Sequence, residues 1–180
     1  MSDSASDPRY LEMFPAWLST LGSDVASLGK IVEDDATDEG VKRYAVSGLN
    51  YLFKSLDLIP DGIDDIGFLD DAFVLRVAAS LAIADHADAK KGALEKLSED
   101  AKALREFLGA DYDRLESYVK GLRKGAARGR TVDDIMGDAD VRKAFAHEVA
   151  AWSKEFQPPS FTRDPKTLIK LKAFLNAKLP

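Results

Sequence analysis

The segment from Asn50 to Leu75 decides the fold and reads NYLFKSLDLIPDGIDDIGFLDDAFVL. Aspartates are spread through it among leucine, isoleucine and phenylalanine, and Pro60, Gly62 and Gly67 interrupt it. Proline disfavours helical geometry in the residue before it, and glycine favours turns. We therefore expect a turn between two buried helices, with the acidic side chains collected at the helix ends.

The helix before this turn is predicted over Val41–Leu56, and the helix after it over Phe68–Asp88. The second is apolar nearly all round, which is typical of a helix buried in the middle of a fold. Further amphipathic helices are predicted on both sides, and no segment shows the two-residue alternation of a strand. The sequence thus predicts an all-α fold, a helical bundle built around an antiparallel helix pair joined by an Asp/Pro turn.

The rest of the chain divides at its prolines. Pro15 is expected to kink or interrupt the first helix, and Ser23 is a predicted N-cap for a helix over Asp24–Glu33. Thr131 and Asp164 are predicted helix N-caps, the latter strengthened by a following proline, and either Asp138 or Asp140 is expected to open the helix between them. We expect a disordered tail (1–7), a helical domain (8–157, with 41–84 as its core), a Pro-containing linker (158–164) and a C-terminal basic amphipathic helix (165–180).

The motif Asp57-Leu-Ile-Pro-Asp61, followed by Gly67-Phe-Leu-Asp70-Asp71 and an apolar run, resembles the signature of the YkvA-like family, a bacterial domain of unknown function. Tyr51 falls on the aromatic position of that signature. The resemblance covers Val41–Ala84 and implies a fold rather than an activity. Family members often have an apolar, proline-containing loop between the two motifs, whereas the loop is acidic here.

Composition narrows the class of protein. With 46% hydrophobic and 31% charged residues, the chain falls among soluble globular proteins. It has no cysteine, which excludes disulfides and thiol chemistry. Its N-terminus is polar and acidic, unlike a secretory signal, and no apolar run reaches the roughly 20 residues of a membrane helix. We expect a cytoplasmic protein without a transmembrane segment, and the pI of about 5.0 argues against a nucleic-acid partner.

The candidate site for chemistry is the cluster Asp57, Asp61, Asp70 and Asp71. Mg²⁺ and Ca²⁺ prefer oxygen ligands, so converging carboxylates could hold either ion, although the spacing is not that of an EF-hand. The structural alternative, which we favour from sequence, needs no cofactor. In it Asp57 and Asp61 cap backbone N–H groups freed at the Pro60 break, and Asp70 and Asp71 complement the dipole of the next helix. Asp57 also needs a partner, such as a metal or an arginine (Arg76 or Arg43).

Two further regions are candidate contact surfaces. The loop around Arg123, Lys124, Arg128 and Arg130 could hold an anion or a partner, although we favour a flexible, solvated connector. The C-terminal helix carries Leu168, Leu171, Phe174 and Leu175, which either pack on the chain's own bundle or enter a partner's groove.

No nucleophile, base or cofactor motif has a workable spacing. From sequence we therefore expect a non-catalytic interaction or regulatory module that binds another protein of unknown identity. The first alternative is a divalent-metal-dependent enzyme that uses the aspartate cluster. The second, suggested by the resemblance and by the lysines of the last helix, is peripheral membrane contact.

Overall fold

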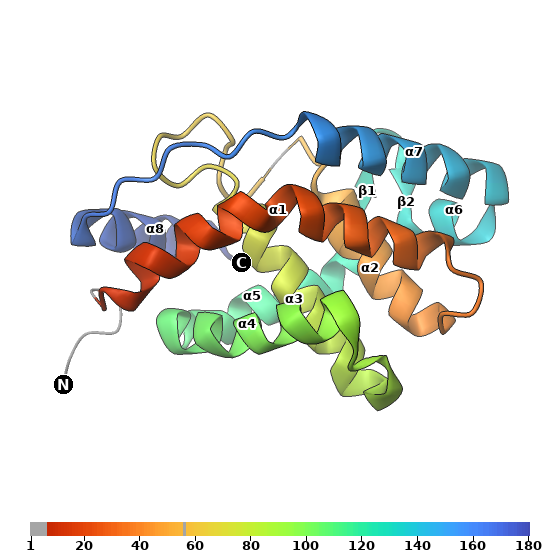
Figure 1. Cartoon of the computed structure of the whole chain (residues 1–180), viewed down its shortest axis with the longest axis horizontal. Helices are drawn as coiled ribbons and strands as arrows, with labels where there is room; N and C mark the ends of the chain where they lie inside the picture. Colours follow the sequence, from red (N-terminus) through yellow and green to blue (C-terminus); the bar gives the residue numbers. More distant parts are fainter. Residues whose placement is uncertain (1–6, 56) are drawn as a thin grey trace.

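The structure is a computed structural model that describes residues 7–55 and 57–180. Within these residues eight α-helices are joined by turns, two short 3-10 helices and one small hairpin, and the predicted all-α class is confirmed (Figure 1). The α-helices are α1 (Arg9–Glu33), α2 (Glu39–Tyr51), α3 (Leu69–Asp85), α4 (Gly92–Leu108), α5 (Asp111–Gly121), α6 (Val132–Gly137), α7 (Ala139–Glu155) and α8 (Pro165–Lys178). The short elements are η2 (Ala87–Ala89), η3 (Leu122–Lys124), β1 (Ala126–Ala127) and β2 (Arg130–Thr131).

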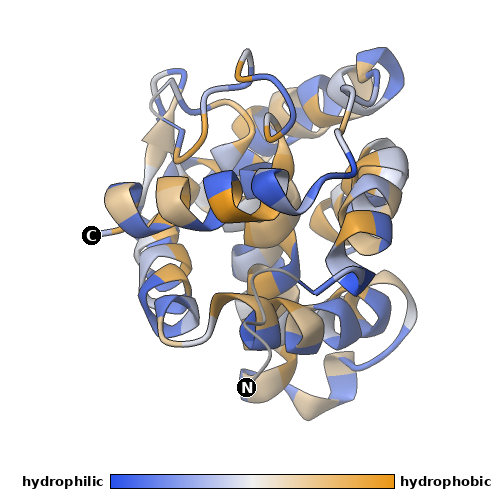
Figure 2. Cartoon of the chain, turned by 90° about the vertical axis from the view of Figure 1, so that its left-hand side faces the viewer, coloured by the Kyte–Doolittle hydropathy of each residue, from blue (hydrophilic) through white to orange (hydrophobic). Residues whose placement is uncertain are grey.

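Helix α3 lies in the middle of the bundle, packed against α1, α2, α4 and α5. It is buried on all sides, as its uniformly apolar sequence predicts. The outer helices carry their hydrophobic residues on one side and hydrophilic residues on the other (Figure 2). Gly48 of α2 lets the two central helices approach closely, because a Cβ there would lie 3.2 Å from Leu75 of α3.

Helix α1 is continuous through Pro15, so the predicted interruption is wrong. A proline inside a helix costs about 3 kcal/mol, mainly through a lost backbone hydrogen bond. Here the helix buries Tyr10, Phe14 and Trp17, whose rings contact those of Phe73 and Phe107. Burial of such side chains stabilises by about 1.5–3 kcal/mol each, which exceeds the cost of the proline.

Helix α2 ends at Tyr51, earlier than the predicted end at Leu56. Leu56 itself lies outside the described residues, as do residues 1–6 of the predicted tail. After Tyr51 the chain continues in a tight turn, in which the N–H of Lys54 donates to the carbonyl of Tyr51 at 3.0 Å. This early end turns the following segment back over the Tyr51 side chain.

Of the predicted N-caps, Thr131, Asp138 and Asp164 are confirmed, whereas Ser23 lies inside α1 and caps no helix. Thr131 and Asp134 form a reciprocal capping box at α6. The carboxylates of Asp138 and Asp164 accept backbone N–H groups at the starts of α7 and α8. These signals are local, which is why the sequence reveals them.

The basic loop folds as a short hairpin that packs on the bundle, rather than as an irregular connector. Strands β1 and β2 pair antiparallel around Arg128 and Gly129, both of which have positive φ (51° and 76°). Two successive residues with positive φ are characteristic of the tight turns that join antiparallel strands. The Arg128 guanidinium lies over the ring of Phe53, 4.6 Å from its centre, which anchors the turn to the bundle.

Helix α8 packs on the chain's own bundle. Leu168, Leu171 and Leu175 are fully buried and Phe174 is half-buried. At the far end of α8, Arg114 of α5 donates to the carbonyl of Asn176 at 3.0 Å. These leucines are therefore part of the core, in agreement with the packing alternative.

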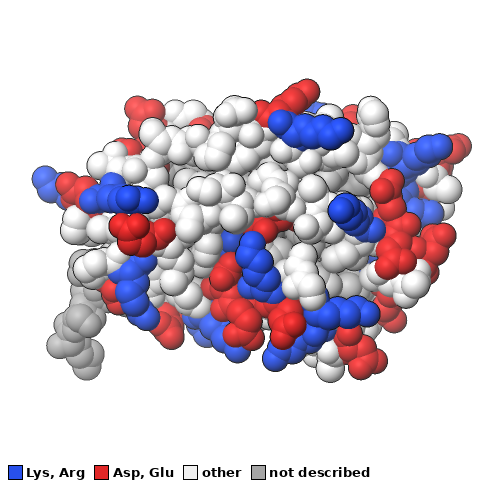
Figure 3. All heavy atoms as spheres, in the orientation of Figure 1, with Lys and Arg blue, Asp and Glu red and all other residues white. Residues whose placement is uncertain are grey.

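Ion pairs join segments that lie far apart in the sequence, such as Arg43 to Asp133 at 2.6 Å and Arg163 to Glu12 at 3.5 Å. On the face shown in Figure 3, acidic and basic side chains are interspersed along the lower edge. No helix among the described residues combines the length and the apolar character that crossing a bilayer requires.

Candidate metal site

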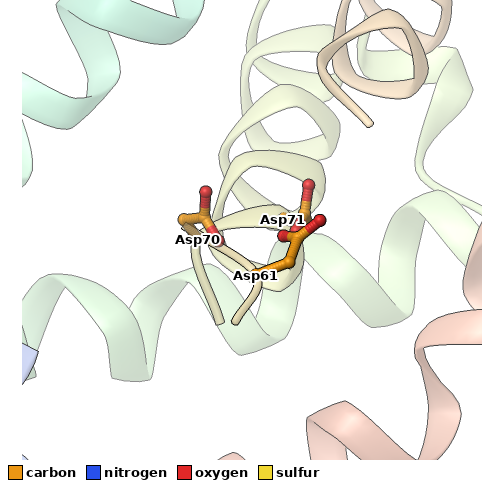
Figure 4. A group of neighbouring side chains, drawn as sticks. All are labelled: Asp61, Asp70 and Asp71. Atoms are coloured by element: carbon orange, nitrogen blue, oxygen red, sulfur yellow. The ribbon is translucent and has the colours of Figure 1, made fainter. Parts of the chain in front are cut away.

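Three of the four predicted aspartates come together at the N-terminal end of α3 (Figure 4). One carboxylate oxygen from each of Asp61, Asp70 and Asp71 lies within 4.8 Å of the other two. Asp70 and Asp71 are buried in the first turn of α3, with 0% and 3% exposure, whereas Asp61 reaches in from the exposed turn. Two of the three carboxylates are thus buried, and the side of the group at Asp61 is open to solvent.

The backbone of the turn is shaped to bring Asp61 to this position. A Cβ at Gly67 would lie 2.3 Å from the carbonyl oxygen of Asp61, so only glycine fits there. Asp65 and Phe68 have positive φ, 74° and 67°. That conformation is unfavourable for a bulky residue such as phenylalanine, and such strain often accompanies functional sites.

Asp70 is oriented by two donors that bind the same oxygen. The Tyr51 hydroxyl donates to Asp70 Oδ2 at 2.5 Å, and the Ile59 N–H donates to it at 3.3 Å. The Leu58 N–H in turn donates to the Tyr51 hydroxyl at 2.7 Å. Asp70 Oδ1 has no hydrogen-bond partner in the part of the chain that the structure describes.

This arrangement corrects the capping interpretation. The N–H groups of Leu58 and Ile59, just before Pro60, are bound by Tyr51 and Asp70 and not by Asp57 or Asp61. Helix α3 has Phe68 at its N-cap position and no side-chain cap. Buried oxygens of three of the aspartates have no hydrogen-bond partner among the described residues: Asp57 Oδ1, Asp70 Oδ1 and Asp71 Oδ2.

The four carboxyl groups are hard to ionise together. Burial raises the pKa of Asp70 to about 7, and burial together with the neighbouring Asp70 raises the pKa of Asp71 well above its usual value. Burial and the charge of Asp61 raise the pKa of Asp57 to about 6, and burial also raises the pKa of Asp61. Such shifts arise when carboxylates lose water and face like charges.

The basic residues that could neutralise Asp57 are engaged elsewhere. Arg76 is fully buried and pairs with Asp100 at 3.1 Å and Asp24 at 3.6 Å. Arg43 pairs with an aspartate of α6. The positive charge of Lys54 lowers the pKa of Asp57, but it offsets only part of the effect of burial.

Aromatic residues complete the surroundings of the cluster. The Tyr51 ring meets the ring of Tyr118 of α5 edge-on, 6.2 Å between centres. Burial and the nearby Asp70 and Asp57 raise the pKa of Tyr118 to about 12, so this residue is neutral at physiological pH, and its hydroxyl accepts a hydrogen bond from Lys54 Nζ at 3.3 Å. The sequence places Tyr51 in the family pattern but does not indicate that it binds Asp70. Nothing in the sequence indicates that Tyr118 lies beside the cluster.

The four predicted basic residues do not form a site of this kind. Arg123 lies over the ring of Tyr44, 5.3 Å from its centre, and Arg130 is paired with Glu148. Lys124 and Arg128 are exposed and lie on the hairpin side of the bundle. A cavity of about 780 Å³ lies between α1, α2 and the start of α4, and none of the four aspartates lines it.

The protein is therefore an all-α bundle that carries a carboxylate cluster in the turn before its central helix. Residues 41–76 match the model of a family described as "Protein of unknown function (DUF1232)". This match confirms the family resemblance over the segment that contains α2, the turn and the first part of α3. Comparisons with curated proteins and with solved structures give no match.

Proposed function

We propose that this chain binds a divalent cation through Asp61, Asp70 and Asp71, with Asp57 close by, and acts as a cation-responsive regulatory module. The observation that carries the proposal is the pair of adjacent buried carboxylates, each with an oxygen that has no partner among the described residues. Buried charges are normally paired or bound to a metal.

The spacing of the oxygens suits a divalent cation, and the number of carboxylates favours Ca²⁺ over Mg²⁺. Three points that lie within 4.8 Å of one another share a centre no more than about 2.8 Å from each of them. Ca²⁺–O distances are about 2.3–2.6 Å and Mg²⁺–O distances about 2.0–2.1 Å. Both ranges fall within this limit, but Mg²⁺ usually binds through only one or two carboxylates, whereas Ca²⁺ takes about six to eight oxygen ligands in a flexible geometry. Ca²⁺ can therefore use all three carboxylates and accept water molecules on the open side at Asp61.

The helix dipole is too weak to explain the cluster. A carboxylate in the first turn of a helix gains about 0.3–1 kcal/mol, and up to about 2 kcal/mol when partly buried. A pKa of about 7 in place of 3.8 means that ionising Asp70 in the folded protein is opposed by on the order of 4 kcal/mol. A bound dication supplies the missing attraction and balances the charge of the neighbouring carboxylates.

We propose regulation rather than catalysis because α3 encloses the cluster on its inner side, where Asp70 and Asp71 are buried. A regulatory module of this kind needs a protein partner, which remains part of the proposal. The enzymatic alternative depends on the open side at Asp61, the direction from which a substrate could reach the cation.

Titration calorimetry of the full chain with CaCl₂ and MgCl₂ at pH 8, after treatment with a chelator, tests the proposal. We expect one Ca²⁺ site, weaker Mg²⁺ binding, and loss of binding in Asp71→Asn. Asp64→Asn is the matched control, because its exposed side chain lies in the same turn but outside the trio. The proposal fails if millimolar Ca²⁺, Mg²⁺ and Mn²⁺ give neither heat nor a change in melting temperature, or if Asp71→Asn binds like the wild type.

A further inference from the structure

The outer side of the acidic turn is held by the C-terminal part of the chain. The Phe68 ring contacts the rings of Phe156 and Trp152 at 5.2 and 6.3 Å between centres. The hydroxyl of Thr162, in the linker shortly before α8, donates to the carboxylate of Asp65. In Figure 1 the yellow turn lies against the blue segment that leads from α7 to α8. We call residues 156–180 the C-terminal clasp.

Helix α8 makes a further contact with the same turn. Lys170 Nζ donates to the carbonyl oxygen of Asp64 at 3.0 Å. Three positions of the turn (64, 65 and 68) thus hold three successive pieces of the C-terminal part: α8, the linker and the end of α7. The contact with the clasp is therefore distributed along the whole turn.

The inner side of the turn carries Asp61, and its backbone contacts the residues that lead to the outer side. The position of Gly67 lies against the Asp61 carbonyl, with only 2.3 Å for a Cβ. Phe68 follows directly, in its constrained positive-φ conformation. A shift of Asp61 toward a bound cation therefore changes the backbone that presents Phe68 to the clasp.

We infer that occupation of the aspartate site and closure of the C-terminal clasp are coupled, so that a divalent cation tightens the clasp and its removal loosens it. This inference rests on the proposed cation site. The coupling is reciprocal by thermodynamic necessity, so a clasp that is loosened by mutation weakens cation binding. Loosening would uncover part of the α8 face formed by Leu168 and Leu171, which is buried in the closed state.

The structure also predicts where the response ends. The C-terminal end of α8 is held by α5, because Arg114 donates to the carbonyl of Asn176 and the Asn176 amide donates to Asp111 at 3.1 Å. This anchor does not involve the acidic turn. We therefore expect the first half of the clasp, residues 156–171, to respond to the cation, and residues 174–180 to serve as an internal control.

Hydrogen exchange of the full chain, measured by mass spectrometry at pH 8 with EDTA or with 5 mM CaCl₂, tests the inference. We expect Ca²⁺ to slow exchange severalfold in peptides from residues 60–70 and 156–171, and to leave peptides from 174–180 unchanged. Trp152 gives a second signal, because its ring contacts Phe68. Its fluorescence should change on Ca²⁺ addition, and Trp152→Phe should remove that change and leave the emission of Trp17.

The reciprocal effect is measured on Thr162→Val, which removes the hydroxyl that binds Asp65, with Thr162→Ser as the control that keeps it. We expect the valine variant to bind Ca²⁺ about threefold to tenfold more weakly, the range expected for loss of one ordinary solvent-exposed hydrogen bond. The serine variant should bind like the wild type. If Ca²⁺ binds but neither exchange in residues 156–171 nor the affinity of Thr162→Val changes, the coupling is refuted and the cation site stands. If the wild type binds no cation, the proposed function and the inference fail together.

Discussion

Raising the pH should destabilise the metal-free protein, and Ca²⁺ should reverse the effect. The pKa of Asp70 is about 7 in the folded protein and 3.8 as an ordinary carboxyl group. A group whose pKa is raised by folding contributes stability at low pH that is lost as the pH rises through the folded value. The groups that face Asp70 and Asp71 are Tyr51 of α2, Tyr118 of α5, and Asp57 and Asp61 of the turn.

The size of the effect follows from the pKa of Asp70. Between pH 5 and pH 7 the unfolded carboxyl is ionised while the folded one keeps its proton, and each pH unit costs about 1.4 kcal/mol. The loss by pH 8 is therefore about 3 kcal/mol, or about 6–12 °C in melting temperature for a domain of this size. Asp71 adds to the loss in the same direction, because its pKa is also raised. Ca²⁺ at a hundredfold excess over its Kd restores about 2.7 kcal/mol.

The assay is thermal unfolding followed by circular dichroism, from pH 5 to pH 8, with EDTA or CaCl₂. In Asp70→Asn the amide takes the place of the protonated acid, so the profile should flatten and the Ca²⁺ response should disappear. Asp64→Asn should keep both. A chelated wild-type protein that is equally stable at pH 5 and pH 8, and that Ca²⁺ leaves unchanged, would refute the reasoning.

Three further substitutions test the framework of the site. Gly67→Ala should weaken Ca²⁺ binding at least tenfold in calorimetry, because its Cβ would displace the Asp61 carbonyl. Gly62→Ala is the control, because the space around its Cβ is open. Equal Ca²⁺ affinities of the two variants would contradict the role of Gly67. Tyr51→Phe should cost about 1–3 kcal/mol in urea unfolding, since it leaves the buried Leu58 N–H unpaired, and a loss below 0.5 kcal/mol would contradict this. Arg76→Met should cost about 1.5–3 kcal/mol in the same assay, because it removes the hydrogen bond to the half-buried Asp100 and one of the two cations beside the buried Asp24, which keeps Lys96. A neutral result would show that the ion pairs of Arg76 are dispensable.

The sequence predicts those parts of the fold that local chemistry decides. The caps at Thr131, Asp138 and Asp164 are predictable because each side chain binds a backbone N–H two or three residues away. The course of α1 through Pro15 is not, because aromatic packing against α3 and α4 decides it. The sequence does not reveal the hairpin at Arg128 either, because strands of two residues are too short to show an alternation of polar and apolar residues.

For the site, the sequence predicts which residues gather but not what they do. The motif locates Asp61, Asp70 and Asp71 in one turn, and the structure brings them together. Their role depends on which groups bind the N–H of Leu58 and Ile59, and that is settled by the early end of α2. Nothing in the spacing of the aspartates reveals that Tyr51 takes over the hydrogen bonding that the capping interpretation assigned to Asp57 and Asp61.

A proton and a cation compete for the same oxygens of Asp70 and Asp71, and this competition distinguishes a metal site from a carboxyl pair that simply stays protonated. If the pair only shares protons, added Ca²⁺ changes nothing at any pH. If it binds Ca²⁺, binding must release the protons that the raised pKa values retain, so affinity should rise steeply between pH 6 and pH 8. Calorimetry at pH 7 in two buffers with different ionisation enthalpies counts those protons directly. We expect a release of about one proton per Ca²⁺ in the wild type; binding without any release would mean that the cation sits elsewhere on the acidic turn and not between the buried carboxylates.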